Sequence, residues 1–84
     1  MDASELESAL HGILSEFGPS LPSEQLENMH SLASAGECGV AFENLCMQLY
    51  EYDIMIAEGT KSRLTLIGTT LNVEPEYWER LSVG

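Results

Sequence analysis

The segment AGECGVAFENLCMQLYEYD, residues Ala35 to Asp53, carries the clearest helical pattern in this chain. At about 100° per residue, many of its apolar side chains fall on one broad face, which predicts a helix over about Glu37–Tyr52. That face is expected to point into the core. It comprises Cys38, Ala41, Phe42, Leu45, Cys46, Leu49 and Tyr52.

The opposite side of this helix has an apolar centre flanked by carboxylates. Glu43, Met47 and Glu51 follow one another at i, i+4 steps, so the two acids bracket the methionine. One interpretation is a central helix that is buried on most sides, Val40 included. The other is a contact surface on which Met47 and Tyr50 supply area while the glutamates pair with a basic partner.

Asp53 follows this face directly and has two interpretations. An aspartate at a turn commonly satisfies backbone donors with its side chain. Equally, Asp53 extends the acidic surface beyond Glu51. The sequence leaves both roles open.

The rest of the chain also has a helical pattern, and residues 1–84 are expected to form a single all-α domain. It is predicted to be a bundle of four helices plus a short C-terminal helix. Either Asp2 or a Ser4–Glu7 capping box starts the first helix, and Gly36 and Asn72 are expected stops. The other helices are predicted at about Asp2–Phe17, from Leu21–Ser23 to Gly36, at Thr60–Leu71, and after Pro75.

Residues Asp53 to Ala57 are apolar but lack a helical period. They are expected to form an ordered loop whose isoleucines close one end of the bundle. The alternation of Tyr52, Ile54 and Ile56 would also suit a short strand, but no partner strand is evident.

The charge is distributed unevenly along the chain. The formal net charge is −11, and no lysine or arginine precedes Lys61. Such an excess repels nucleic acid and anionic lipid and attracts a cationic partner. Acidity also favours solubility without any partner. Disorder is excluded because 44% of the residues are apolar and periodically spaced.

Motifs for catalysis, cofactors and metals are absent from the sequence. No nucleophile elbow, phosphate loop, zinc pattern or calcium loop is present, and His11 and His30 are expected to be surface or boundary residues. Cys38 and Cys46 are about 12 Å apart on one helix, too far for a disulfide. With no secretory signal and no membrane span, we expect a cytoplasmic protein that is not an enzyme.

An acyl-carrier-like protein is a short, acidic and helical alternative. Ser20 precedes the second helix, where such a carrier bears its prosthetic arm. Pro19 replaces the expected aspartate, Pro22 follows closely and the first loop is too short, so this alternative fits poorly.

The central segment resembles the motif of the MafI-type immunity proteins, which are encoded beside polymorphic or contact-dependent growth-inhibition toxins. Departures occur at Met47, where a polar residue is expected, and at Met55, where proline is common. The resemblance is carried by Ala35-Gly36-Glu37, Gly39, Ala41, Glu43, Leu45-Cys46, Gln48-Leu49-Tyr50-Glu51 and Asp53, and beyond them by Gly68, Pro75, Tyr77-Trp78 and Leu81.

This resemblance implies an all-helical protein that binds a cognate toxin domain, often a nuclease such as an RNase, in the bacterial cytoplasm. Nucleases hold phosphates with basic residues, so an inhibitor can offer carboxylates to the same bases. Free protein is expected to be a monomer or a weak homodimer. Glu37 also matches the acids of the motif. The expected partner-binding residues are Glu43, Met47, Tyr50, Glu51 and Asp53.

Two alternatives accompany this interpretation. Motif residues can be mostly structural, in which case specificity would lie on the first two helices, for example at Glu5, Glu24 and Glu27. The protein could also be an acidic adaptor or nucleic-acid mimic that acts on an endogenous basic protein.

Overall fold

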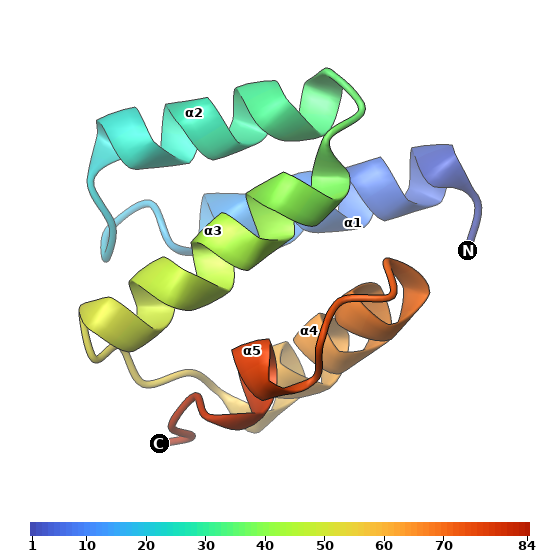
Figure 1. Ribbon diagram of the computed structural model, residues 1–84. Helices are drawn as coiled ribbons and strands as arrows, with labels where there is room; N and C mark the ends of the chain where they lie inside the picture. Colours follow the sequence, from blue (N-terminus) through green and yellow to red (C-terminus); the bar gives the residue numbers. More distant parts are fainter.

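Five helices and no strand make up the computed structural model, which describes all residues from 1 to 84. The predicted all-α bundle of four helices and a short fifth is confirmed. α3 lies between the α1–α2 pair and the α4–α5 pair, and α1 also contacts α4, so the bundle closes around one core (Figure 1). The helices are α1 (Ala3–Glu16), α2 (Ser23–Ser34), α3 (Cys38–Glu51), α4 (Glu58–Thr70) and α5 (Glu76–Glu79).

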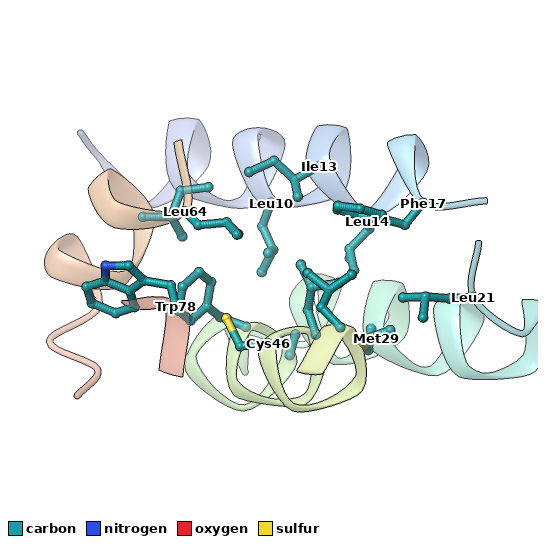
Figure 2. Packing of buried hydrophobic residues seen from close by; sticks show 14 of the residues in the cluster. Leu10, Ile13, Leu14, Phe17, Leu21, Met29, Cys46, Leu64 and Trp78 are labelled. Atoms are coloured by element: carbon teal, nitrogen blue, oxygen red, sulfur yellow. The ribbon is translucent and has the colours of Figure 1, made fainter. Parts of the chain in front are cut away.

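The core is a single apolar cluster in which α3 takes the central place, as its pattern predicted. Phe42, Leu45 and Leu49 are fully buried. Figure 2 shows Leu10 of α1 pointing toward the helix that carries Cys46. The prediction was wrong for Tyr52, whose side chain is 53% exposed. Tyr52 is the C-cap of α3, and both of its neighbours are exposed as well, so the end of the helix extends past the core.

Three helices end in the same way, with a residue in the left-handed region. Gly36, Asp53 and Asn72 have φ values of 86°, 52° and 61°, and the two amides at each end bond back to the last turn. These are Schellman motifs, which satisfy the last carbonyl groups of a helix. The stops predicted at Gly36 and Asn72 are confirmed.

The structure decides between the two caps considered for α1 and corrects the predicted first residue of α4. Asp2 caps α1 and forms a reciprocal capping box with Glu5, so the Ser4–Glu7 alternative is not used. α4 starts at Glu58, two residues before the predicted Thr60, because Ala57 already has the extended backbone of an N-cap.

The loop before α4 is ordered, as expected, and Ile56 is buried within it. Its backbone also has a partner that the sequence did not reveal. Ile56 N–H donates to the carbonyl of Ser82 at 2.9 Å, and Gly84 N–H donates to the carbonyl of Ile56 at 3.1 Å. An isolated parallel bridge with Val83 therefore ties this loop to the C-terminal segment.

Close packing of α4 against α5 depends on a glycine. A Cβ atom built at Gly68 would lie 2.6 Å from Cε3 of Trp78 and closer still to Cζ3. Trp78 is buried and packs edge-on against Phe42, with ring centroids 5.8 Å apart. None of the five helices is long and apolar enough to cross a bilayer.

Candidate partner-binding surface

The outward side of α3 borders a groove formed with α5. The groove has a volume of about 250 Å³ and is lined by Met47, Glu76, Tyr77 and Arg80. Met47 is half-buried because α5 lies alongside it. This residue is therefore on the outward side, as its position in the helical period predicted.

Tyr50 lies next to this groove and carries a cation on its ring. The guanidinium carbon of Arg80 is 3.9 Å from the ring centroid, while the Tyr50 side chain stays 51% exposed. An arginine stacked in this way still presents its N–H groups outward. The sequence placed Tyr50 on this side but gave no signal for its pairing with Arg80, thirty residues later.

The three predicted acids occupy different places around the groove. Glu43 is half-buried one turn before Met47, and Glu51 is exposed one turn after it, so they flank Met47 on the same helix. Asp53 lies beyond the helix end and is exposed. Its backbone takes the left-handed position, but its side chain forms no hydrogen bond, so the side-chain role expected at a turn is not observed.

Val40 completes the outward side of α3. Its side chain is 44% exposed, so the interpretation that includes Val40 among the buried residues of α3 is wrong at this position. Exposed or half-buried residues therefore continue along this side of the helix from Val40 to Glu51. The alternative of a mixed apolar and acidic surface describes this side better.

Every lysine and arginine of the chain makes an internal contact. Lys61 Nζ donates to the carbonyls of Glu79 and Leu81 at 3.0 and 2.9 Å. Arg63 donates two hydrogen bonds to the Glu16 carboxylate, at 2.5 and 2.7 Å. Arg80 is the cation stacked on Tyr50. The sequence contains no other lysine or arginine, and only Arg63 pairs with a carboxylate, so three bases stand against fourteen acids.

Most of the carboxylates, in contrast, have no internal partner. Only four of the fourteen acids form a side-chain hydrogen bond or an ion pair, namely Asp2, Glu5, Glu7 and Glu16. The bonds from Arg63 hold the pKa of Glu16 below its usual range. The other ten are exposed or half-buried: Glu24, Glu27, Glu37, Glu43, Glu51, Asp53, Glu58, Glu74, Glu76 and Glu79.

The thiols are not placed for chemistry. Both cysteines are free, and Cys46 lies in the core, where burial raises its pKa to about 12. Cys38 is half-buried and donates weakly to the carbonyl of Ala33, and its pKa is also raised, chiefly by burial. A thiol with a raised pKa is a poor nucleophile at neutral pH.

One polar cluster escaped the sequence analysis. His11 and His30, expected as separate surface or boundary residues, meet between α1 and α2 with their Nδ1 atoms 2.6 Å apart. Their separation of 19 residues offered no signal, since the contact depends on how the two helices align. No group of three or more His, Cys, Asp or Glu side chains converges in a way that could hold a metal ion.

Comparisons of the chain with protein-family models, with curated proteins and with solved structures return no match. The residues and the geometry of the surface must therefore support any functional assignment. The most distinctive property of the protein is the contrast between its bases, which all make internal contacts, and its carboxylates, which mostly make none.

Proposed function

We propose that this protein is an immunity protein of the MafI type, which binds a basic toxin domain and blocks it by occlusion. The toxin is of the nuclease class, as the resemblance of the central segment implies. The binding surface is the outward side of α3 together with the adjoining groove along α5. Its residues are Glu43, Met47, Tyr50, Glu51 and Asp53, with Glu76, Tyr77 and Arg80 beside them.

The observation that carries this proposal is the excess of carboxylates without an internal partner over the bases. Only Arg63 pairs with a carboxylate, and Lys61 and Arg80 are too few to balance the other ten. The resulting field attracts a cationic surface and speeds its association. A basic nuclease cleft, which must hold phosphates, has the complementary charge.

The groove adds contact area to this charge. Met47 and the ring of Tyr77 supply an apolar floor, and the exposed ring of Tyr50 lies at its edge. Aromatic and methionine side chains are enriched at protein interfaces, and the rim of an interface is polar. The protein itself performs no chemistry in this mechanism, because covering the nuclease cleft is enough to exclude its substrate.

The partner is identified by a pull-down of the tagged protein from its own cells, coupled to a growth-rescue assay with the recovered basic domain. Recovery of one toxic nuclease whose lethality is suppressed supports immunity. A housekeeping basic protein, with no rescue of any toxin, supports the alternative of an acidic adaptor or nucleic-acid mimic. That alternative depends on the same unpaired carboxylates.

The surface is tested by two matched double charge reversals. Glu43→Lys with Glu51→Lys changes the proposed surface, while Glu24→Lys with Glu27→Lys makes the same change in net charge on α2. We expect the first pair to slow association with the toxin by about 10- to 100-fold and the second by clearly less. The opposite order would move the binding surface to the first two helices.

The salt dependence of the association rate distinguishes long-range electrostatic steering from short-range contacts in the complex. Exposed charges are screened beyond a Debye length of about 8–10 Å at 0.1–0.15 M salt. The association rate should therefore fall as salt is raised, while the dissociation rate changes little. An association rate that is indifferent to salt would exclude electrostatic steering.

A further inference from the structure

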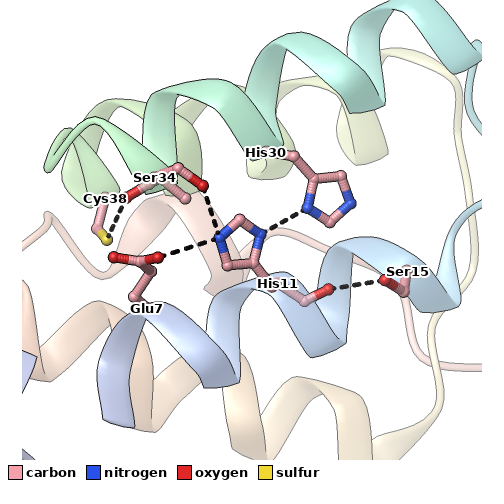
Figure 3. Close-up of polar contacts among 7 residues, drawn as sticks. Glu7, His11, Ser15, His30, Ser34 and Cys38 are labelled. Atoms are coloured by element: carbon pink, nitrogen blue, oxygen red, sulfur yellow. Dashed lines mark hydrogen bonds and ion pairs between the residues drawn. The ribbon is translucent and has the colours of Figure 1, made fainter. Parts of the chain in front are cut away.

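Two histidines on neighbouring helices meet through their ring nitrogens. His11 of α1 and His30 of α2 have Nδ1 atoms 2.6 Å apart, ring planes inclined by only 6° and ring centroids 4.9 Å apart (Figure 3). The distance between the two Nδ1 atoms is shorter than the distance between the ring centroids by about the sum of the two ring radii. The closest approach is therefore edge to edge, which is the geometry of an N–H···N hydrogen bond.

The environment of His11 defines the direction of this bond. Its other nitrogen, Nε2, lies 3.5 Å from the Glu7 carboxylate and 3.2 Å from the Ser34 hydroxyl (Figure 3). A carboxylate accepts hydrogen bonds only, so it favours a hydrogen on Nε2 of His11. Nδ1 of the neutral His11 ring is then an acceptor, and His30 donates to it from its own Nδ1.

The hydrogen-bonded pair can accept one additional proton without losing the bond between the Nδ1 atoms. A proton added to Nε2 of His30 leaves the Nδ1 bond in place and makes its donor cationic, which strengthens it. A second proton has to go to Nδ1 of His11. Both Nδ1 atoms would then carry hydrogens directed at each other, between two like charges, so the contact at 2.6 Å cannot persist.

We propose that His11 and His30 form an acid-sensitive latch between α1 and α2. The latch stays closed when the pair is neutral or carries one added proton. It opens when both rings are protonated, because the hydrogen bond is then replaced by repulsion between two cations.

The other titratable groups near the two histidines do not change the conclusion that the latch opens only when both rings are protonated. Glu7 stabilises a positive charge on the pair, but it lies next to His11 only. Glu27, one turn before His30 on the same helix, forms no ion pair with either ring. From α3, the neighbouring Cys38 thiol bonds to a backbone carbonyl and carries no charge at neutral pH.

The sign of the pH effect follows from the proton count. Burial, and then the charge of His11, hold the pKa of His30 below its ordinary value of 6.5, so the folded pair resists carrying a charge on both rings. The unfolded chain therefore binds the second proton more readily than the folded chain does. Stability from the latch is present above about pH 6.5 and is lost as the pH falls through the lowered pKa.

Nitrogen-15 NMR of the imidazoles tests the proposal directly, because the chain contains only two histidines. We expect two titration steps whose proton affinities differ by more than about tenfold, and before the first step one Nδ1 that carries hydrogen and one that does not. In the second step, backbone amide shifts should change on α1 and α2 but not on α4 and α5. Two independent titrations with similar midpoints, or both rings protonated at Nε2 alone, would overturn the latch.

A matched pair of variants isolates the role of Glu7. Glu7→Gln and Glu27→Gln remove the same charge, but only Glu7 lies within reach of the pair. We expect Glu7→Gln to lower the proton affinity of the first step at least about threefold, with a smaller change for Glu27→Gln. Equal effects of the two variants would show that only net charge matters and would contradict the proposed geometry.

His30→Gln supplies the stability control. This variant retains a polar side chain on α2 and leaves a single titrating ring on α1. The midpoint of urea unfolding in the wild type should fall as the pH drops through the second titration step, and most of this decrease should be absent from His30→Gln. The proposal fails if the variant shows the same decrease as the wild type. Because these experiments use the free protein, their outcome is independent of the proposed toxin partner.

Discussion

The two helix pairs on either side of α3 are held together by different chemistry. The α4–α5 half contains all three bases, and each makes a directed contact within the fold. The α1–α2 half contains none. Its two helices are joined by apolar packing and by the pair of histidines, and the amide pair of Gln25 and Gln48 joins α2 to α3.

This difference explains how such an acidic chain closes its fold. Lys61 bonds to carbonyls at the end of α5, where a cation is favoured by the helix dipole, and Arg63 ties α4 to α1. Only Glu16 pairs with a lysine or arginine, and most acids of both halves have no internal partner. The two halves meet along α3, and the proposed binding surface follows this seam (Figure 1).

The largest expected effect is at the contact between α4 and α5. Gly68→Ala should destabilise the protein by about 3 kcal/mol, because the added methyl group would overlap the ring of Trp78, which is itself packed against Phe42. Gly12→Ala on α1 is the matched control. No atom lies within 4 Å of its added Cβ, so the better helix propensity of alanine should stabilise by about 0.5–1 kcal/mol. Urea unfolding measures the change in the free energy of unfolding in both variants. Changes of the same sign in Gly68→Ala and Gly12→Ala would contradict this prediction.

The second-largest effect on stability is expected when the contacts of Lys61 with the C-terminal segment are removed. Lys61→Met removes two hydrogen bonds to carbonyls and should cost about 1–2 kcal/mol, a range reduced by the partial exposure of Lys61. Exchange of the Gly84 amide, which bonds to Ile56, should become faster. Arg80→Met makes the same charge change but removes only an exposed cation–π contact, worth about 0.5 kcal/mol. Similar losses in both variants would mean that charge, and not the lysine geometry, stabilises this half.

A smaller effect is expected from the Glu16–Arg63 pair, whose side chains are about half exposed. Its contribution should stay below about 1 kcal/mol, since solvent screens exposed pairs. Arg63 lowers the pKa of Glu16, so this contribution is present above the unfolded value of 4.5 and is lost as the pH falls through the lower folded value. Unfolding of Glu16→Gln and of Glu27→Gln between pH 7 and 3 tests this. The two variants should differ at pH 7 and converge at low pH.

The smallest effect is expected at the contact between α2 and α3. Gln48 donates to Gln25 at 3.1 Å, but its own Oε1 is buried without a hydrogen-bond partner. Gln48→Met loses one bond and also removes an unsatisfied acceptor, so stability should stay within about 0.5 kcal/mol of the wild type. A loss greater than about 1.5 kcal/mol, measured by urea unfolding, would mean that this polar contact also holds α2 against α3.

Part of the proposed binding surface could be predicted from the helical period. The period placed Met47 and Tyr50 on the outward side of α3, opposite Phe42, because side chains within one helix keep a constant angular spacing. The same projection failed at Tyr52, since it assumes that the core extends to the last residue of the helix. Neither the groove with α5 nor the Arg80 contact was predictable, because both require the distance between two separate helices.

By itself the sequence determined the all-α class, the buried face of α3, the stops at Gly36 and Asn72, and the excess of acid before Lys61. These features depend on neighbours within one or two helical turns, so local spacing is sufficient. Only the tertiary structure decided which distant groups meet: His11 with His30, Ile56 with Val83, Lys61 with the end of α5, and Gly68 with Trp78. Such pairs depend on the crossing angle and axial register of helices, which are set by packing of the whole core.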